Sequence, residues 1–225
     1  MVSGAGGSPE LPEPPHDCPL CPRLLAFREA VRSLHPEWRN APVPSFGTAS
    51  ARLLIVGLAP GLNGANRTGR PFTGDHAGVL LYSTLLEFGF ATGQYEARPD
   101  DTLGMYDAVL SNAVRCVPPA NKPEASEIST CRQFLIRTID ALPNLRAIVA
   151  LGRIAHESVV RALGEPVARF PFAHCAEHIV PRADRKLAVF DSYHCSRYNT
   201  NTGVLTTDMF RAVFVRVRAY LDASA

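Results

Sequence analysis

Residues 52–90 read RLLIVGLAPGLNGANRTGRPFTGDHAGVLLYSTLLEFGF, and three successive patterns in this stretch decide the fold. The run RLLIVGL (52–58) is short, continuous and apolar, as is typical of a strand buried on both faces. The segment HAGVLLYSTLLEFGF (76–90) carries apolar residues at helical spacing. The stretch therefore predicts a buried strand, a long glycine-rich connection and a helix.

The same order of strand and helix recurs three more times. Further strands are expected at DAVLSNAV (107–114), RAIVALG (146–152) and KLAVFDS (186–192), and further helices at 124–142, 153–163 and 206–221. Strands that alternate with helices form parallel sheets with helices on both faces. We therefore predict an α/β fold with three α/β/α layers around a central four-stranded parallel sheet.

The length of the chain suits one domain, because 225 residues of which 46% are hydrophobic can bury one sizeable core. Residues 1–15 are rich in Gly, Pro and Ser and are expected to be a disordered leader. Residues 16–225 are expected to form a single domain. The default expectation for the oligomeric state is a monomer.

Charge and hydropathy exclude some classes of protein. No apolar run approaches the roughly 20 residues of a membrane helix, and the first residues lack the pattern of a signal peptide, so a cytoplasmic protein is expected. The formal charge of +2 permits a polyanionic partner without arguing for one. Only Lys122 and Lys186 are lysines, which disfavours Schiff-base chemistry.

Unusual residues follow each predicted strand, where open α/β sheets bind their ligands. These segments are GLAPGLNGANRTGRPFTGD (57–75), NAVRC (112–116), LGR (151–153) and SYHCSRYNTNTG (192–203). The first segment has five glycines, so its backbone could approach a ligand closely, but it matches neither common nucleotide-phosphate motif. One ligand site at this edge of the sheet explains all four segments.

Four side chains at this edge have both a functional and a structural interpretation. Phe72 could stack on a flat ligand or be a core aromatic, and Asp75 could orient a water or cap the following helix. Asn112 could pair with the edge of a base or with nearby backbone. His194 could donate to a developing anion or be structural. The other histidines show no convincing ligand spacing.

Four of the six cysteines form two pairs. Cys18 and Cys21 make a C-x2-C motif, and Cys116 and Cys131 flank a proline-rich stretch. The two pairs indicate one four-thiolate metal site, either an iron–sulfur cluster or zinc. Cys175 and Cys195 are interpreted as small buried residues.

The strings GLAPGLNGANRTGRPFTGD, LSNAVRC and SYHCSRYNTNTG together resemble family 5, the type-b enzymes, of the uracil-DNA glycosylase superfamily. The resemblance runs from about Cys18 to the final helix. It implies an α/β/α fold with a four-stranded parallel sheet, and a [4Fe–4S] cluster on Cys18, Cys21, Cys116 and Cys131. By the resemblance, iron–sulfur is favoured over zinc.

The resemblance also implies a function and residue roles. The enzyme would be a monofunctional DNA-repair glycosylase that removes uracil, and also hypoxanthine or xanthine, from DNA. Phe72 would stack on the extruded base, Asn112 would read its edge, Asp75 would position water and His194 would stabilise the leaving base. The implied base pocket also includes Gly57, Ala59 and Gly61, and the implied DNA contacts are Ser196, Arg197, Tyr198 and Asn199.

One departure from the family concerns the residue after His194. Relatives usually read His-Pro-Ser where this chain has His194, Cys195 and Ser196, so the proline that would fix the backbone is absent. Two rival hypotheses remain: a non-catalytic iron–sulfur nucleic-acid-binding protein of the same fold, and a zinc-stabilised hydrolase of nucleosides. The water-orienting carboxylate of Asp75 favours the enzyme over the non-catalytic binding protein. A loop around Arg197 that could hold DNA disfavours the nucleoside hydrolase, because free nucleosides need no such loop.

Overall fold

The computed structural model describes residues 11–182 and 185–223. The helices are α1 (Pro22–Leu34), α2 (Ala65–Thr68), α3 (His76–Glu87), α4 (Ala125–Asp140), α5 (Arg153–Ala162), α6 (Arg197–Asn201) and α7 (Thr207–Ala223), with two 3-10 turns, η1 (Pro119–Asn121) and η2 (Val167–Arg169). The strands are β1 (Phe46–Gly47), β2 (Leu53–Gly57), β3 (Ala91–Thr92), β4 (Gly104–Met105), β5 (Ala108–Asn112), β6 (Ala147–Leu151), β7 (Glu177–Pro181) and β8 (Lys186–Ser192). The four strands and four helices expected from the apolar patterns are all present.

The main sheet has the strand order β1-β5-β2-β6-β8-β7. Its four central strands, β5, β2, β6 and β8, are mutually parallel, as expected. The expected number of strands was wrong, because β1 and β7 add an antiparallel strand at each edge and make six. A separate two-stranded sheet pairs β3 with β4.

The two edge strands lack the apolar run that identifies the central ones. β1 is only two residues long. In β7 only Val180 is buried, and the remaining residues are exposed or half-buried. An edge strand that is covered on one face needs few apolar residues, so composition alone gives it a weak signal.

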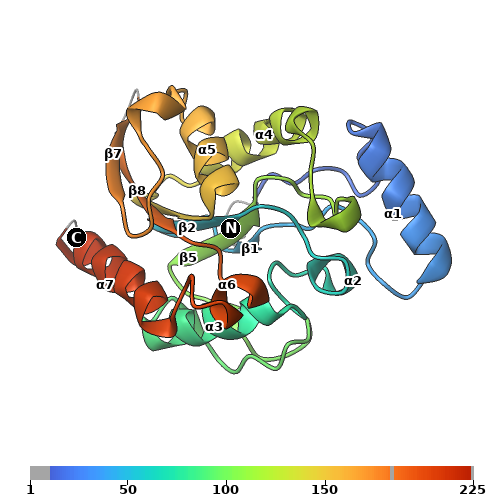
Figure 1. Cartoon of the computed structure of the whole chain (residues 1–225), viewed down its shortest axis with the longest axis horizontal. Helices are drawn as coiled ribbons and strands as arrows, with labels where there is room; N and C mark the ends of the chain where they lie inside the picture. Colours follow the sequence, from blue (N-terminus) through green and yellow to red (C-terminus); the bar gives the residue numbers. More distant parts are fainter. Residues whose placement is uncertain (1–10, 183–184, 224–225) are drawn as a thin grey trace, which may run out of the picture.

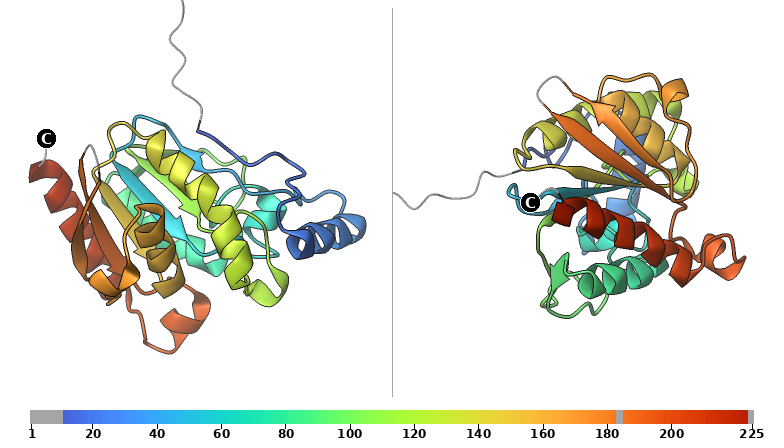
Figure 2. Two further views of the ribbon diagram at one scale, coloured as in Figure 1. Left: turned by 90° about the horizontal axis from the view of Figure 1, so that it is seen from above. Right: turned by 90° about the vertical axis from the view of Figure 1, so that its left-hand side faces the viewer.

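Side chains that alternate along the strands build two cores, one on each face of the sheet. On one face Leu53 and Ile55 of β2 pack with α3 and α7, and on the other Leu54 and Val56 pack with α4 and α5. Figures 1 and 2 show these helix pairs as layers on opposite sides of the sheet, with α1 and α7 at opposite ends of the molecule. The three-layer α/β/α arrangement is confirmed.

Helix α4 begins with a reciprocal capping box. Glu124 accepts from the backbone of the first turn, and the Glu127 carboxylate accepts from the Glu124 backbone N–H at 2.7 Å. Arg23 of α1 also donates to Glu127 at 2.7 and 2.8 Å. These contacts tie α1 to the start of α4, which places the two cysteine-bearing segments side by side.

The expected leader lies partly outside the described residues. Of residues 11–15, which are described, Leu11 packs against the core on the α4 and α5 face. Glu13 pairs with Arg115 at 2.8 Å and accepts from the Ser45 backbone N–H at 2.8 Å. In the described part of the chain, the helices are all too short or too polar to cross a membrane.

Candidate active site

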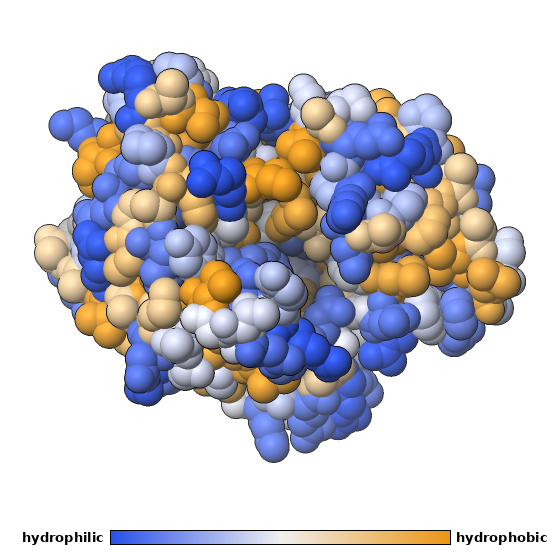
Figure 3. Space-filling view, in the orientation of Figure 1, coloured by the Kyte–Doolittle hydropathy of each residue, from blue (hydrophilic) through white to orange (hydrophobic). Residues whose placement is uncertain are grey.

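A cavity of about 570 Å³ opens at the carboxyl ends of the parallel strands. We call it the base pocket; of the residues expected from sequence, its lining includes Ala59, Gly61, Asp75, His194, Ser196, Arg197 and Tyr198. Figure 3 shows this face of the molecule hollowed near its centre, with apolar and hydrophilic side chains around the hollow. The strand ends meet here because neighbouring parallel strands finish at the same edge of a sheet.

Asp75 precedes α3 but does not cap it. Its backbone is extended, and its side chain makes no capping hydrogen bond to the helix. The carboxylate lies against two glycines instead, because a Cβ on Gly64 would sit 2.0 Å from its Oδ2 and a Cβ on Gly61 would sit 2.6 Å away. Burial raises the pKa of Asp75, and the Ala65 backbone N–H and the Arg67 charge oppose that rise. The carboxylate therefore faces the pocket.

Phe72 is a buried aromatic residue in a strained backbone conformation. Its φ of 55° is in the left-handed region, which costs a non-glycine residue of order 1–3 kcal/mol. Hydrogen bonds on both sides hold it: Tyr82 Oη donates to the Pro71 carbonyl at 2.5 Å, and Tyr95 Oη donates to the Phe72 carbonyl at 3.3 Å. Strain that the surroundings enforce in this way is typical of a functional site.

A buried ion pair fixes the same loop from the side. Arg70 donates to both oxygens of Asp101 at 2.7 and 2.8 Å and to Thr73 Oγ1 at 2.7 Å. The Arg70 hydrogen bonds lower the pKa of Asp101 to about 2, so its carboxylate is charged at neutral pH. This pair fixes the residues on either side of Phe72.

Asn112 ends β5 and is buried, as expected for an amide at a strand end. A Cβ on Gly57 would lie 2.5 Å from both Asn112 Oδ1 and Phe72 Cζ, so the glycine lets the amide and the ring come together. Within the described residues the Asn112 side chain has no hydrogen-bond partner. A buried amide of this kind has donors and an acceptor available for a ligand.

His194 lies across from Phe72, with 6.3 Å between the two ring centroids. Burial lowers the pKa of His194 to about 4, so the imidazole is neutral at pH 7 and donates through a single N–H. No described residue forms a hydrogen bond with its ring. The backbone is well held, since Asn199 Nδ2 donates to the His194 carbonyl at 2.8 Å.

The residues expected to contact DNA form the short helix α6 at the rim of the pocket. Ser196 caps it, accepting from the Asn199 backbone N–H at 3.4 Å. Arg197 and Tyr198 are exposed, and Tyr198 is 74% exposed. Asn199 points inward to the His194 carbonyl, so its side chain positions the histidine loop.

Several residues of the base pocket carried no recognised signal in the sequence. They are His76, Ala77 and Asn121, whereas Leu58, Asn63 and Gly74 lie in the glycine-rich segment 57–75 that the sequence indicated. Asn121 has a φ of 56° in the turn η1, a conformation that asparagine tolerates better than most residues. An asparagine in a proline-rich loop reads as a turn former, so nothing in the string ANKPE pointed to a ligand.

The four paired cysteines meet around one small cavity between α1, the end of β5 and α4. Cys18, Cys116 and Cys131 are buried and Cys21 is partly buried, all in one cluster with free thiols. Burial raises the pKa of Cys131 to about 12 and that of Cys21 to about 11. The four thiols therefore lie close enough together that they could hold one metal or cluster.

Two observations test which metal these thiols fit. The one group of described residues whose three ligand atoms lie within 4.8 Å of one another is His156, His178 and Asp191, so the sulfurs are spread more widely. Zinc bound at about 2.3 Å needs sulfurs about 3.8 Å apart. Arg28 Nη1 donates to Cys116 Sγ at 2.9 Å, and its buried Nε has no partner among the described residues. The wide spacing and the spare N–H fit a larger cluster with sulfide acceptors.

The group of His156, His178 and Asp191 is an ion-pair network and not a metal site. His156 Nδ1 lies 2.6 Å from Asp191 Oδ1, and its Nε2 lies 2.7 Å from the Phe170 carbonyl oxygen. Burial lowers the pKa of His156, but the Asp191 and Phe170 acceptors outweigh burial and raise it overall. Both ring nitrogens of His156 are thus engaged by acceptor oxygens of the protein.

These features define a class: an α/β protein whose parallel strands end at a cavity lined by a carboxylate and an imidazole. The family model of the uracil DNA glycosylase superfamily matches residues 44–218. The chain belongs to the uracil-DNA glycosylase superfamily.

Curated relatives place it more narrowly. The chain is 45% identical to a type-5 uracil-DNA glycosylase of Thermus thermophilus over 207 residues, which cover 89% of this chain and 92% of the relative. It is 38% identical to the type-5 enzyme of Mycobacterium leprae over 95% of this chain and 96% of the relative. It is 36% identical to that of Pyrobaculum aerophilum over 90% of this chain and 88% of the relative. The family resemblance read from three strings of the sequence is confirmed.

Proposed function

We propose that this protein is a monofunctional DNA glycosylase that hydrolyses the N-glycosidic bond of uracil in DNA and leaves an abasic site. We extend the proposal to other deaminated bases, hypoxanthine and xanthine. Superfamily membership and the type-5 relatives support it. The observation that carries it is that the Phe72 ring lies between His194, which lines the base pocket, and Asn112, which lies behind that lining, and that neither side chain has a hydrogen-bond partner among the described residues.

The extruded base would lie against Phe72 with its edge toward Asn112. An aromatic ring stacks on any base, whereas the amide offers a donor and an acceptor together, which suits the edge of uracil. Gly57 supports this arrangement because a side chain there would collide with both partners.

Asp75 would orient the attacking water and stabilise the positive charge that develops on the sugar. The bond from the water oxygen to C1′ forms as the bond from C1′ to the base nitrogen breaks, and the electron pair of that bond leaves with the base. The water loses a proton to Asp75 or to bulk solvent. Gly61 and Gly64 support this role, since they leave room for the carboxylate at the pocket wall.

His194 would stabilise the departing base as an anion. The neutral imidazole can donate one N–H to an oxygen of the base without first losing a proton. Because the pKa of His194 is about 4, this form predominates at pH 7.

The rim would hold the DNA around the flipped nucleotide. Extrusion of a base costs a few kcal/mol, which contacts to the opened strand must offset. Ser196, Arg197 and Tyr198 are at the pocket mouth, and exposed Arg197 is suited to a phosphate.

Cys18, Cys21, Cys116 and Cys131 would hold a [4Fe–4S] cluster, with zinc disfavoured by their spacing. A bound cluster would supply a cross-link between the N-terminal segment, the end of β5 and α4. Hydrolysis moves no electrons, so this chain's own residues carry the reaction. We also propose that the protein acts as a cytoplasmic monomer.

The non-catalytic alternative is not favoured, and one experiment separates it from the enzyme. Purified protein is incubated with oligonucleotides that carry uracil or hypoxanthine, and abasic sites are then cleaved with alkali. We expect strand breaks, and we expect Asp75→Ala to slow excision by about 10²–10⁴-fold while DNA binding is kept.

The matched control is Asp208→Ala, because Asp208 is an exposed acid in the first turn of α7 and lines no part of the base pocket. That variant should excise at the wild-type rate. Absence of strand breaks in both the uracil and the hypoxanthine oligonucleotides would contradict the enzyme proposal. An unchanged excision rate in Asp75→Ala would show that Asp75 takes no part in the mechanism.

A further inference from the structure

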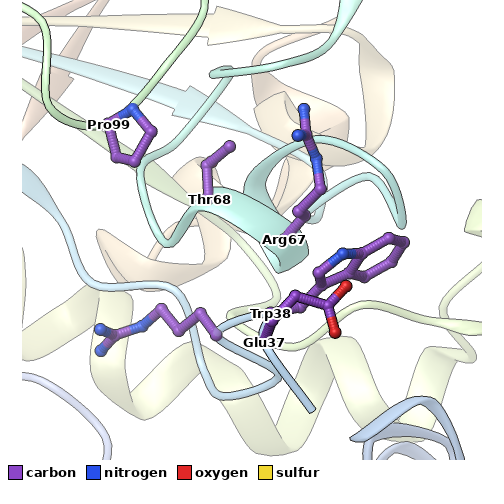
Figure 4. A pocket seen from close by; sticks show the side chains of 6 residues that line it. Glu37, Trp38, Arg67, Thr68 and Pro99 are labelled. Carbon is purple, nitrogen blue, oxygen red and sulfur yellow. The ribbon is translucent and has the colours of Figure 1, made fainter. Parts of the chain in front are cut away.

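A second open cavity, of about 660 Å³, lies beside α2 and outside the base pocket. We call it the flank groove; its lining is Glu37, Trp38, Arg39, Arg67, Thr68 and Pro99. Figure 4 shows Arg67 and Thr68 on α2, with Trp38 near Arg67 and Pro99 at the opposite side of Thr68. None of these residues takes part in the chemistry proposed above.

Arg67 stands between the flank groove and the base pocket. Its Nε donates to the Asn63 carbonyl at 2.8 Å, and a Cβ on Gly74 would lie 2.9 Å from its Nη2. Asn63 and Gly74 both line the base pocket. A strand that enters the base pocket at this wall can therefore continue over Arg67 into the groove.

The groove wall that carries Trp38 is fixed to α2. The Arg39 backbone N–H donates to the Arg67 carbonyl at 3.1 Å, and that of Asn40 donates to the Asn66 carbonyl at 3.1 Å. The side chain of Asn66 also donates to Asn40 Oδ1 at 2.9 Å, with both residues buried. Such a wall keeps its shape without a ligand, which lowers the entropic cost of binding.

The aliphatic part of the Arg39 side chain is also held in place. A Cβ on Gly69 would lie 2.3 Å from Arg39 Cδ, so the stem crosses directly over this glycine. The guanidinium of Arg39 is exposed, and no carboxylate of the described residues pairs with it. Arg67 is likewise exposed and forms no ion pair with a described carboxylate. Two exposed positive charges thus flank the groove, and that of Arg67 also acts on Asp75 at the wall of the base pocket.

Trp38 adds an aromatic surface beside Arg67 (Figure 4). One face of its indole stacks on His35, with ring centroids 4.0 Å apart and planes 8° apart. Trp38 itself is half-buried. The groove also contains one acid, Glu37, whose carboxylate lies 3.7 Å from His35 Nδ1. An aromatic ring beside exposed arginines is the combination that binds single-stranded nucleic acid without reading its sequence.

We propose that the flank groove binds the DNA strand next to the extruded nucleotide, with phosphates on Arg39 and Arg67 and an unstacked base or sugar on Trp38. The proposal rests on the proposed function. It assigns to this chain a second DNA contact on the far side of the base pocket from α6, so that the strand is held on both sides of the flipped nucleotide.

Trp38 is the single tryptophan of the chain, so its fluorescence reports the groove directly. The probe is a duplex that carries a tetrahydrofuran analogue of an abasic site, which the enzyme cannot hydrolyse. Nucleotides are removed one at a time from the 5′ or the 3′ flank. We expect binding to change the Trp38 emission, and shortening on one side alone to abolish that change.

Two variants test the contacts separately. Trp38→Ala should weaken binding of the long probe by about 5- to 150-fold, the range of one base–aromatic stack. Arg39→Ala, at an exposed site, should lower the slope of log K against log salt by roughly one. Arg161→Ala is the matched control, because Arg161 lies on α5 and lines neither cavity.

The outcomes separate this proposal from the proposed function. A protein that excises uracil without any change in Trp38 emission, and with an unaltered salt slope in Arg39→Ala, would overturn the flank groove alone. A protein that shows the emission change but excises no base would overturn the glycosylase and leave the groove. A protein that binds no DNA would overturn both.

Discussion

The pKa values of Asp75 and His194 are shifted in opposite directions, which the sequence alone does not reveal. Both are in loops at the carboxyl edge of the sheet, and the sequence identified both as candidates. Their charge states depend on burial: the pKa of Asp75 is raised and that of His194 is lowered to about 4. Burial disfavours the charged form of each group, so it acts in opposite directions on an acid and a base.

A pH profile of excision tests these charge states. The rate under single-turnover conditions should stay level as pH falls through 6.5, the ordinary pKa of histidine, because His194 is already neutral there. At lower pH the rate should fall as Asp75 and His194 become protonated. The measurement is the initial rate of abasic-site formation at a series of pH values.

The variant His194→Gln shows whether Asp75 or His194 causes the fall in rate at low pH. Glutamine keeps an N–H donor and does not titrate, so an acidic limb that persists in the variant belongs to Asp75. A fall in wild-type rate centred near pH 6.5 that disappears in His194→Gln would show that the imidazole titrates normally, contrary to the geometry.

Cys195 takes the place of the family's proline without leaving the loop loose. Its side chain is fully buried in the core under α3 and α7, and burial raises the pKa of its thiol to about 12. A buried, protonated thiol resists oxidation. The Asn199 amide and the Ser196 cap hold the neighbouring backbone, so the loop has supports other than a fixed proline dihedral.

At the scale of elements, the sequence predicted the repeated strand–helix units and missed the elements that are short or have few apolar residues. Long apolar runs identified β2, β5, β6 and β8, and the rule for parallel strands brought their loops to one edge. β1 and α2 have two and four residues, too few for a periodic signal, whereas β7 is as long as β2 but has only one buried residue. The direction of the Asp75 side chain could not be predicted either, because it depends on Gly61 and Gly64 making room for it.

The contact between α3 and the loop before it gives a prediction at this scale. A Cβ on Gly78 would lie 1.9 Å from the Phe72 carbonyl oxygen, so Gly78→Ala must displace the strained loop or the helix. Alanine favours a helix over glycine by about 1 kcal/mol, so the variant should keep α3. We expect excision to fall by up to about 10²-fold through misplacement of Phe72.

The control for this substitution is Gly104→Ala. A Cβ at Gly104 would meet Thr92 Oγ1 at 3.6 Å, an ordinary contact, and the site is remote from the base pocket. Excision rates and circular dichroism of both variants are measured together. Wild-type excision by a folded Gly78→Ala protein would show that the position of Phe72 does not limit the rate.

At the scale of the whole molecule, the cysteines join segments that are far apart in the chain. The sequence showed two pairs, and the fold brings them together because Arg23 of α1 binds Glu127 of α4 beside the cavity. The spacing of the sulfurs could not be predicted, since it depends on where α1 lies relative to α4. The proposal of a cluster in place of zinc rests on that spacing.

Loss of the metal should therefore weaken the fold more than the chemistry. A cross-link that closes a loop of about 100 residues contributes roughly 4–5 kcal/mol in the chain-entropy model. For a chain of this size that corresponds to a fall in Tm of about 10–15 °C. We expect Cys131→Ser to lose iron and sulfide and to show such a fall, with proteolysis beginning near α1, the segment that the lost cluster would otherwise hold through Cys18 and Cys21.

Cys175→Ser provides the matched control, because Cys175 is half-buried and outside the four-cysteine cluster. It should keep its iron and sulfide and its Tm. Wild-type protein prepared without air is assayed beside both variants for iron, sulfide and zinc. Zinc in place of iron would refute the cluster, and metal loss in Cys131→Ser with an unchanged Tm would mean that Arg23, Glu127 and the packed helices hold α1 without the cross-link.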